Sequence, residues 1–364
     1  MLKCLHLTNF RNYEKGDFKF DKTTIFIGPN GTGKTNIIEA IYLLSTGRSW
    51  RTSKDSEVVK WGEDFAKISA EIAAEEAHQL DLVIQKQGYE APLIKTIKIN
   101  DVKRKLVDLL GTLPAVLFSP EALEMASGAP ALRRRFLDIL LCQTDKKYTL
   151  NLIELGKVLK SRNKLLFYIK LGKSKPDELD FWDEKLVELG TFIIQKRKEA
   201  IGVLNKKVSD IYSEISGQKE ELLIKYHPSV LPDQFAETLV AVREREIENT
   251  ISMHGPHRDD FLFSLDGRDL TTFGSRGEFR TTILALKMGE LEYLKKNLEA
   301  EPVLLLDDIF SELDAVRRLH LVKIVESQQT IISTTDLDHI EDNLKKKAKI
   351  VEVPAGTKHN GKNK

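Results

Sequence analysis

The residues best suited to chemistry form a glycine-rich loop near the N-terminus. They match the phosphate-loop pattern G-x-x-x-x-G-K-[ST] at every position and are Gly28, Pro29, Asn30, Gly31, Thr32, Gly33, Lys34 and Thr35. In such loops the backbone N–H groups face the β-phosphate, because glycine lets the chain curl tightly around it. Lys34 is then placed to bridge the β- and γ-phosphates, and Thr35 to ligate Mg²⁺. The loop therefore predicts a site for a nucleoside triphosphate.

The elements on either side of the loop are those that this chemistry needs. Residues 24–27 are a short apolar run typical of a buried strand. After the loop, apolar residues recur at helical spacing: Ile37, Ile38, Ile41 and Leu44. A helix that begins at the loop adds the positive potential of its N-terminus to the phosphate site. A strand, loop and helix in this order are the context that makes the motif specific.

A second apolar run, residues 303–306, ends in two carboxylates, as a Walker B strand does. We expect Asp307 to hold Mg²⁺ through water, and Asp308 to orient or deprotonate the attacking water. Adjacent residues of a strand point to opposite faces, so the two carboxylates need not share one role. Ser311 is expected to be the N-cap of the next helix, and residues 311–314 also fit a loop that senses a second nucleotide across a dimer.

A third segment precedes the last long helix and allows two interpretations. Ser275 and Glu278 have the spacing of a capping box, which would explain both residues without a ligand. Alternatively, the Ser275 hydroxyl and the Gly277 N–H face a γ-phosphate bound by another subunit. A carboxylate at Glu278 would repel that phosphate unless Arg276 or Arg280 neutralises it. Both interpretations remain open at the level of sequence.

Composition and periodicity set the class of protein. With 364 residues, 41% of them hydrophobic, the chain is long enough for two domains. It has no apolar run of membrane-spanning length, and its two cysteines form no disulfide framework. We therefore expect a soluble cytoplasmic protein without membrane contact. Alternating residues between 67 and 99 predict an antiparallel sheet wetted on one face, whereas residues 131–215 show helical periodicity broken at 171–176. The fold class is α/β with an inserted helical domain.

The formal net charge of +1 requires any nucleic-acid site to be a local basic patch. Residues 157–175 contain basic side chains and no acid, and Lys157, Lys160 and Lys164 share one helical face. With Arg133, Arg134 and Arg135 they are the candidates for sequence-independent phosphate contacts, although a solvated helix face explains them equally well. His257 and Arg258 also fit contacts with nucleotide or DNA, or a structural pairing of Arg258 with Asp259 or Asp260.

Other ATP- and GTP-binding classes fit less well. A transporter's nucleotide-binding subunit would carry an LSGGQ-type signature and a histidine one strand beyond Walker B, where this chain has Ile331-Ile332-Ser333-Thr334-Thr335. A GTPase needs an N-K-x-D motif, and a nuclease with an ATPase head needs a further carboxylate cluster. None of these is evident in the sequence.

Taken together, these segments resemble the ABC-type ATPase heads and, among them, the RecF family of bacterial recombination mediators. The matching segments are LTNFRNY at 7–13, GxNGxGKTNxxEA at 28–40, GRSWR at 47–51, FSPE at 118–121, RRRFLD at 133–138, GPHRDD at 255–260 and LDDIFSELD at 306–314. One departure concerns the family signature S-[QR]-G-Q, whose last position is Glu278 in this chain.

The resemblance implies a P-loop ABC-type ATPase head in which residues 1–120 and 300–364 form lobe I and residues 121–299 a helical lobe II with a short coiled-coil-like arm. It implies a weak ATPase, with ATP and Mg²⁺ as cofactors, that forms a head-to-tail dimer when ATP is bound. By analogy Arg11 and Asn36 join the nucleotide site, and Ser275 and Gly277 contact the partner's phosphate. The implied function is to clamp double-stranded DNA at gaps and, with RecR and RecO, to promote RecA loading for repair, replication restart and SOS induction. The alternatives are an ABC transporter subunit or another SMC-like ATPase.

Overall fold

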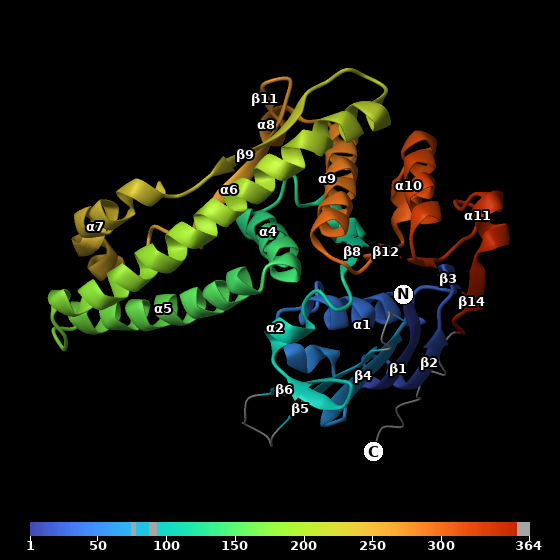
Figure 1. Ribbon diagram of the computed structural model, residues 1–364, viewed down its shortest axis with the longest axis horizontal. Coiled ribbons are helices and arrows are strands. Elements are labelled where there is room, and N and C mark those ends of the chain that lie inside the picture. Colours follow the sequence, from blue (N-terminus) through green and yellow to red (C-terminus); the bar gives the residue numbers. More distant parts are fainter. Residues whose placement is uncertain (74–77, 87–92, 355–364) are drawn as a thin grey trace, which may run out of the picture. The chain divides into compact units, whose positions relative to one another are not determined.

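The computed structural model describes residues 1–73, 78–86 and 93–354 (Figure 1). The protein divides into two compact units. The first consists of Met1–Ala122 and Leu294–Lys364, and the second of Leu123–Tyr293. Among the described residues, no helix is both long enough and apolar enough to span a bilayer.

The first unit contains an antiparallel sheet in the order β2-β1-β4-β5-β6-β7. Its strands are β1 (Leu2–Phe10), β2 (Tyr13–Lys19), β4 (Phe65–Ile72), β5 (His78–Gln85), β6 (Ile94–Ile99) and β7 (Val102–Arg104). Ile68, Ala70 and Ile72 are buried on β4 and Glu71 is exposed, as predicted, but Ser69 is buried too and donates to the buried Asp81 of β5 at 2.5 Å. The predicted one-sided sheet is therefore confirmed only in part. Asn100 and Asp101 form the predicted turn with φ of 51° and 62°.

A parallel sheet in the same unit positions the phosphate loop. Its order is β14-β3-β13-β12-β8, and every neighbouring pair is parallel. The strands are β3 (Thr23–Ile27), β8 (Ala115–Phe118), β12 (Val303–Asp307), β13 (Thr330–Thr334) and β14 (Lys349–Glu352). Helix α1 (Lys34–Thr46) packs against β8, β12 and β13. Because the strands run the same way, the loop after β3 and the carboxylates at the end of β12 lie at one edge of the sheet.

Shorter elements complete the first unit around these two sheets. They are the 3₁₀ turns η1 (Asp55–Val58) and η4 (Ile309–Glu312) and the helices α2 (Leu106–Leu109), α3 (Pro120–Leu123), α10 (Ala315–Ser327) and α11 (Asp342–Lys347). The last residue of α3 belongs to the second unit.

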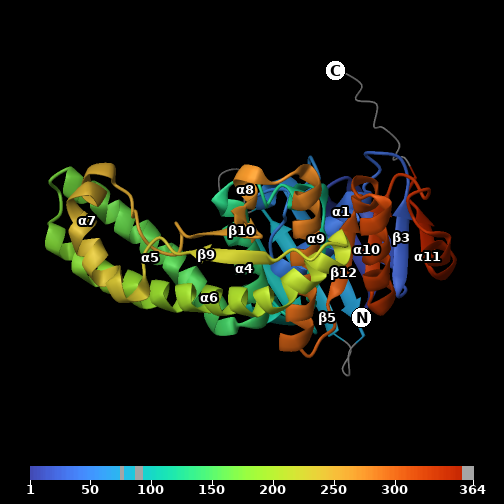
Figure 2. The ribbon, with the colours of Figure 1, turned by 90° about the horizontal axis from the view of Figure 1, so that it is seen from above.

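The second unit is mainly helical. Its helices and 3₁₀ turns are α4 (Pro130–Thr144), α5 (Lys146–Lys170), η2 (Pro176–Leu179), α6 (Asp180–Ser216), η3 (Pro232–Gln234), α7 (Phe235–Asn249), α8 (Leu270–Phe273) and α9 (Arg276–Asn297). A small antiparallel sheet consists of β9 (Leu222–His227), β10 (Asp260–Leu265) and β11 (Arg268–Asp269). The final turn of α9 lies in the first unit. Figures 1 and 2 both show α5 and α6 side by side, so the predicted pair of antiparallel helices is confirmed. Helix α7 was not among the elements predicted from the sequence.

Candidate nucleotide site

The phosphate loop joins β3 to α1 through backbone conformations that only glycine adopts without strain. Gly31 and Gly33 have φ of 81° and 108°, and Gly33 is the N-cap residue of α1. At Gly28 a side chain is excluded by space, because a Cβ there would lie 2.4 Å from the carbonyl oxygen of Val353. Pro29 and Asn30 are exposed at the tip of the loop. The loop therefore presents its backbone directly at the N-terminus of a helix, as an anion site requires.

Lys34 is buried at the start of α1 and points back over the loop. Its ammonium donates hydrogen bonds to the carbonyl oxygens of Gly28 (2.7 Å) and Pro29 (2.9 Å). Burial lowers the pKa of Lys34, and the nearby carboxylates of Asp308 and Asp307 partly oppose that shift. A partly desolvated ammonium gains more from an anion than an exposed one does, which suits contact with phosphate.

Thr35 and Asp307 bring the two sheet-edge elements into contact. The Thr35 hydroxyl donates to Asp307 Oδ1 at 2.9 Å, and the Ser333 hydroxyl on β13 donates to the same oxygen at 2.5 Å. Burial raises the pKa of Asp307, while these two hydrogen bonds lower it. Neighbouring oxygens of an octahedral Mg²⁺ shell lie about 3 Å apart, since each is about 2.1 Å from the metal. The spacing of the Thr35 and Asp307 oxygens therefore fits Mg²⁺, held directly or through one water.

Asp308 differs from Asp307 because β12 ends between them. Its φ is +50°, and its N–H donates to the Ser333 carbonyl oxygen at 3.1 Å. The backbone thus leaves the strand conformation at Asp308, so the strand alternation that we expected does not set the directions of the two carboxylates. Burial raises the pKa of Asp308, against the opposing charge of Lys34. Its Oδ1 is buried without a hydrogen-bond partner in the part of the chain that the structure describes, so it retains the capacity to accept a proton from water.

Arg11 lies in the turn between β1 and β2 and is engaged within the protein. Its Nε and Nη2 donate to the two carboxylate oxygens of Glu39 at 2.8 and 2.5 Å, and Nη1 donates to the Glu57 carbonyl oxygen at 2.6 Å. Glu39 on α1 is completely buried, and it also accepts hydrogen bonds from Ser49 and Arg51. The sequence analysis missed this role of Glu39. The available signal was a carboxylate placed among the apolar residues Ile38, Ala40 and Ile41 of one helix.

In the second unit, the capping-box interpretation of Ser275 and Glu278 is confirmed. The Ser275 N–H donates to Glu278 Oε2 at 2.6 Å, and the Glu278 N–H donates to the Ser275 hydroxyl oxygen at 3.2 Å. Hydrogen bonds to the Glu278 carboxylate from the backbone N–H and from the side chain of Ser275 lower the pKa of Glu278, which therefore stays ionised at neutral pH. The Ser275 oxygen accepts in this box, and the Ser275 hydroxyl also donates to the Glu278 carboxylate. Thr281 donates to the Gly277 carbonyl oxygen at 3.0 Å, in the first turn of α9.

Two predictions about local pairing are wrong. The N-cap of α10 is Asp314, which accepts from the Arg317 N–H at 2.9 Å, whereas Ser311 lies in η4 and donates to the Asp308 carbonyl oxygen. Arg258 pairs with neither neighbouring aspartate, because it donates to the Ser252 carbonyl oxygen at 3.3 Å.

Asp259 and Asp260 instead hold buried arginines of other elements. Asp259 pairs with Arg197 of α6 at 3.3 Å, and Asp260 accepts from Arg133 of α4 at 2.8 Å through both oxygens. Arg133 is only 3% exposed, so its prediction as a DNA contact is wrong. Arg134 donates to the Asp259 carbonyl oxygen and Arg135 is partly buried, whereas Lys157, Lys160 and Lys164 are all exposed on α5.

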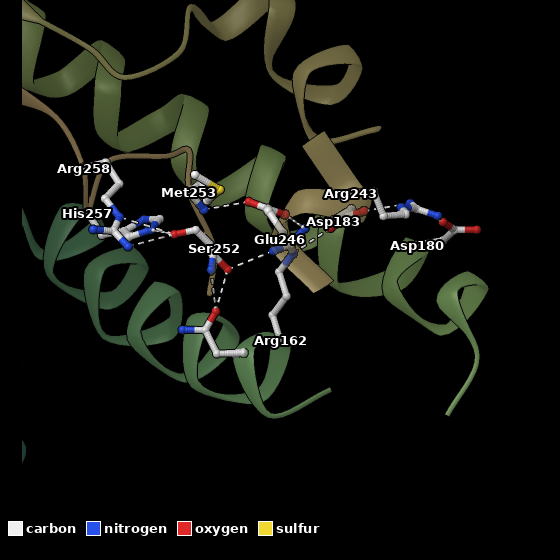
Figure 3. A network of polar contacts seen from close by, with 10 residues as sticks. Arg162, Asp180, Asp183, Arg243, Glu246, Ser252, Met253, His257 and Arg258 are labelled. Carbon is white, nitrogen blue, oxygen red and sulfur yellow. Dashed lines mark hydrogen bonds and ion pairs between the residues drawn. The ribbon is translucent and has the colours of Figure 1, made fainter. Parts of the chain in front are cut away.

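Arg162, within the same basic segment, is completely buried. Its three guanidinium nitrogens donate to Asp183 (2.7 Å), Ser252 (2.9 Å) and Glu246 (2.6 Å) (Figure 3). These partners come from α6, α7 and the segment after α7, so Arg162 joins three parts of the second unit. The basic segment therefore combines a structural arginine with exposed lysines.

The described residues contain no group of three or more His, Cys, Asp or Glu side chains that could hold a metal. The metal-compatible position is the pair of Thr35 and Asp307 at the phosphate loop.

The parallel sheet, the phosphate loop and the paired Thr35 and Asp307 define an ABC-type ATPase head. Residues 1–359 match the family model described as RecF/RecN/SMC N terminal domain, and the chain belongs to the RecF family within it. The DNA replication and repair protein RecF of Agathobacter rectalis is 42% identical over 358 residues, 98% of each chain. The protein of the same name from Bacillus cytotoxicus is 39% identical over 367 residues, 97% of this chain and 96% of the relative.

Solved structures agree with this assignment. The structure of the recombination mediator protein RecF with ATP in the RecFOR pathway has a TM-score of 0.86 and 34% identity, and the match covers 93% of each chain. An Smc head bound to the C-winged helix domain of ScpA has a TM-score of 0.53 at 15% identity and covers 96% of this chain and 93% of that one, which shows a shared fold. The expected family and fold class are thereby confirmed.

Proposed function

We propose that the chain binds ATP with Mg²⁺ and hydrolyses it slowly. The observation that carries this proposal is the hydrogen bond from Thr35 to Asp307, which brings the phosphate loop and the Walker B strand together at magnesium spacing. Lys34 would hold the β- and γ-phosphates, Thr35 and Asp307 would hold the metal, and Asp308 would orient or deprotonate water. The bound metal would neutralise charge on the phosphates. Asn36 and Arg11 lie beside the loop, and their contact with nucleotide is part of the proposal.

We further propose that the chain is a recombination mediator that dimerises head to tail when ATP is bound and clamps double-stranded DNA at gaps. The names of its relatives and the description of the solved RecF structure support a role as a recombination mediator in replication and repair. The proposal adds RecR and RecO as partners in RecA loading during repair, replication restart and SOS induction. The Ser275 hydroxyl and the Gly277 N–H would complete the partner's nucleotide site. Membership of the RecF family favours this function over the transporter alternative and over another SMC-like ATPase.

Sedimentation of the protein with and without ATP and a gapped duplex tests both proposals. We expect the mass to double only when ATP is present, and the dimer to co-sediment with the duplex. Asp308→Asn should still dimerise with ATP, because it keeps Lys34, Thr35 and Asp307, while hydrolysis falls about a hundredfold. A mass that ignores ATP would overturn the dimer, and normal turnover by Asp308→Asn would remove that residue from catalysis.

The same measurement locates the DNA contacts. Changing Lys157, Lys160 and Lys164 together to alanine should weaken duplex binding and reduce its salt dependence by about three phosphate contacts. The matched control changes the three lysines of α11, Lys345, Lys346 and Lys347, which alters the net charge equally at another place. An equal loss in both triple variants would point to net charge alone and would overturn the α5 site.

A further inference from the structure

We propose that Asn12 is a positioning residue for the phosphate loop, because its amide holds the Thr32 carbonyl and thereby aims the Gly33 N–H into the nucleotide site. The Asn12 Nδ2 donates to the Thr32 carbonyl oxygen at 3.0 Å. This inference rests on the ATP binding proposed above and adds to it a residue outside the phosphate-loop motif. The experiment below separates failure of this inference from failure of ATP binding.

The β1–β2 hairpin places Asn12 in contact with the phosphate loop. Phe10 and Tyr13 pair across the two strands, so Arg11 and Asn12 form a two-residue turn, with a φ of 53° at Arg11. A Cβ built on Gly33 would lie 2.7 Å from Asn12 Nδ2 and 2.8 Å from the Tyr13 hydroxyl. The hairpin thus touches the loop at the residue that begins α1, and glycine is needed there to let the turn come this close.

A chain of hydrogen bonds fixes which way the Asn12 amide points. Arg51 can only donate, and its Nη1 lies 2.7 Å from Asn36 Oδ1. Asn36 must therefore turn its Nδ2 toward Asn12, whose Oδ1 accepts at 2.8 Å. Asn12 Nδ2 then faces the Thr32 carbonyl oxygen, which can only accept, and donates to it. The Arg51 guanidinium, at the start of this series of hydrogen bonds, therefore determines the orientation of both amides.

At its other end, this series of hydrogen bonds begins from Glu39 in the protein interior. Arg51 Nη1 also lies 3.2 Å from Glu39 Oε2, and Glu39 is completely buried. Arg11 binds both oxygens of the same carboxylate, and the Ser49 hydroxyl donates to one of them at 2.5 Å. An acceptor held by several donors cannot turn easily, so the chain from Glu39 to Asn12 has one stable arrangement.

The geometry of the peptide bond carries this orientation to the phosphate site. The described residues contain no cis peptide bond, so the peptide unit between Thr32 and Gly33 is planar and trans, and its C=O and N–H point in opposite directions. A carbonyl held toward Asn12 therefore turns the Gly33 N–H away from the hairpin. Backbone N–H groups of this loop are the groups that cradle the phosphates. Asn12 thus sets a donor in place before nucleotide arrives, which lowers the reorganisation needed on binding.

The test compares nucleotide affinity in variants that break the chain at different links. Asn12→Asp keeps the size of the side chain but removes the donor to Thr32, and Asn36→Ala breaks the chain one link earlier. We expect each to weaken ATP and ADP binding by about five- to tenfold, while turnover at saturating ATP changes by less than about twofold. The double variant should bind ATP and ADP no more weakly than Asn12→Asp alone, because both changes break the same series of hydrogen bonds. Asn100→Ala is the matched control, since Asn100 occupies another hairpin turn of the same sheet and bonds the Gln79 N–H.

Calorimetric titration with each nucleotide and steady-state hydrolysis give these quantities, and a thermal melt shows whether each variant is folded. If the unmodified protein does not bind ATP, the proposed function fails. If it binds ATP and both folded variants bind equally well, ATP binding stands and the role of Asn12 is wrong. A loss of turnover with unchanged affinity would also overturn it, because positioning of the loop acts on binding. If Asn12→Asp is unfolded, Asn12→Ala, which removes the same donor without adding a charge, decides.

Discussion

Among the described residues, the buried charges around Arg162 and those at the phosphate loop differ in how completely they are paired. In the second unit, every guanidinium nitrogen of Arg162 has an acceptor within 2.9 Å, and Glu246 also accepts the Met253 N–H. In the first unit, Lys34 bonds the carbonyl oxygens of its own loop. Asp308 there keeps one buried oxygen without a partner among the described residues.

This difference separates a structural cluster from a ligand site. Buried charges cost free energy unless they are paired, so a cluster that only supports the fold is expected to satisfy each member. At the phosphate loop, burial shifts the pKa of Lys34 down and those of Asp307 and Asp308 up, each toward the neutral form. Groups held in this way are stabilised by a charged ligand that the protein itself does not supply.

Removing Arg162 should have the largest effect. Arg162→Ala leaves the carboxylates of Asp183 and Glu246 buried without their shared cation, and we expect the free energy of unfolding to fall by about 3–5 kcal/mol. Urea denaturation of the purified protein measures this change. Lys157→Ala is the control on the exposed face of the same helix and should change stability by less than about 0.5 kcal/mol. A loss below 1 kcal/mol for Arg162→Ala would mean that the cluster is not structural.

Lys34→Met should show the opposite pattern. It replaces a desolvated ammonium with an apolar side chain of similar length, so we expect stability to change by less than about 1 kcal/mol. ATP affinity should fall about tenfold to a hundredfold, because a charge-assisted bond to phosphate is lost, and ATP-dependent dimerisation should disappear. Light scattering with ATP and urea denaturation measure the two effects. An intact ATP-dependent dimer, or strong destabilisation, would contradict the contrast between the clusters.

The sequence predicted the phosphate site more completely than the structural cluster. Residues 28–35 form a contiguous motif, and their chemistry depends on backbone geometry that glycine reveals in the sequence. The strands before Asp307 and around Ile68 were predictable because their apolar patterns are local.

Side-chain partners distant in sequence were not predictable. Arg162 looked like one of several exposed basic residues, since its partners Asp183 and Glu246 lie 21 and 84 residues away. Arg133 likewise pairs with Asp260, 127 residues later. Glu39 belongs to the conspicuous segment 28–40, but its contacts with Arg11 and Arg51 depend on how the β1–β2 hairpin packs on α1. Patterns within one element predict its burial, whereas pairing between elements requires the tertiary fold.

The pH dependence of stability tests the polar region beside Arg162. Burial lowers the pKa of His257 to about 4, aided by the charges of Arg258, Arg134 and Arg162. The unfolded chain binds a proton as pH falls below about 6.5, whereas the folded chain does so only near pH 4. Stability should therefore decrease between these values, by at most about 1.4 kcal/mol for each pH unit. His257→Gln should reduce the difference in unfolding free energy between pH 7 and pH 5, and an unchanged difference would show that other groups produce it.

The smallest expected effect concerns Glu278. Its carboxylate accepts a hydrogen bond from the Ser275 N–H, yet it lies where the partner's triphosphate is proposed to bind. Glu278→Gln preserves the capping box, since glutamine also accepts from the Ser275 N–H, and it removes the negative charge near the partner's triphosphate. We expect the ATP-dependent dimer to tighten about two- to fivefold, measured by sedimentation over a range of protein concentrations. Glu292→Gln, an exposed change on the same helix, should leave the dimer unaltered. A dimer that weakens in Glu278→Gln would show that this carboxylate assists the interface, and the phosphate would then have to approach α9 from a direction in which Glu278 does not repel it.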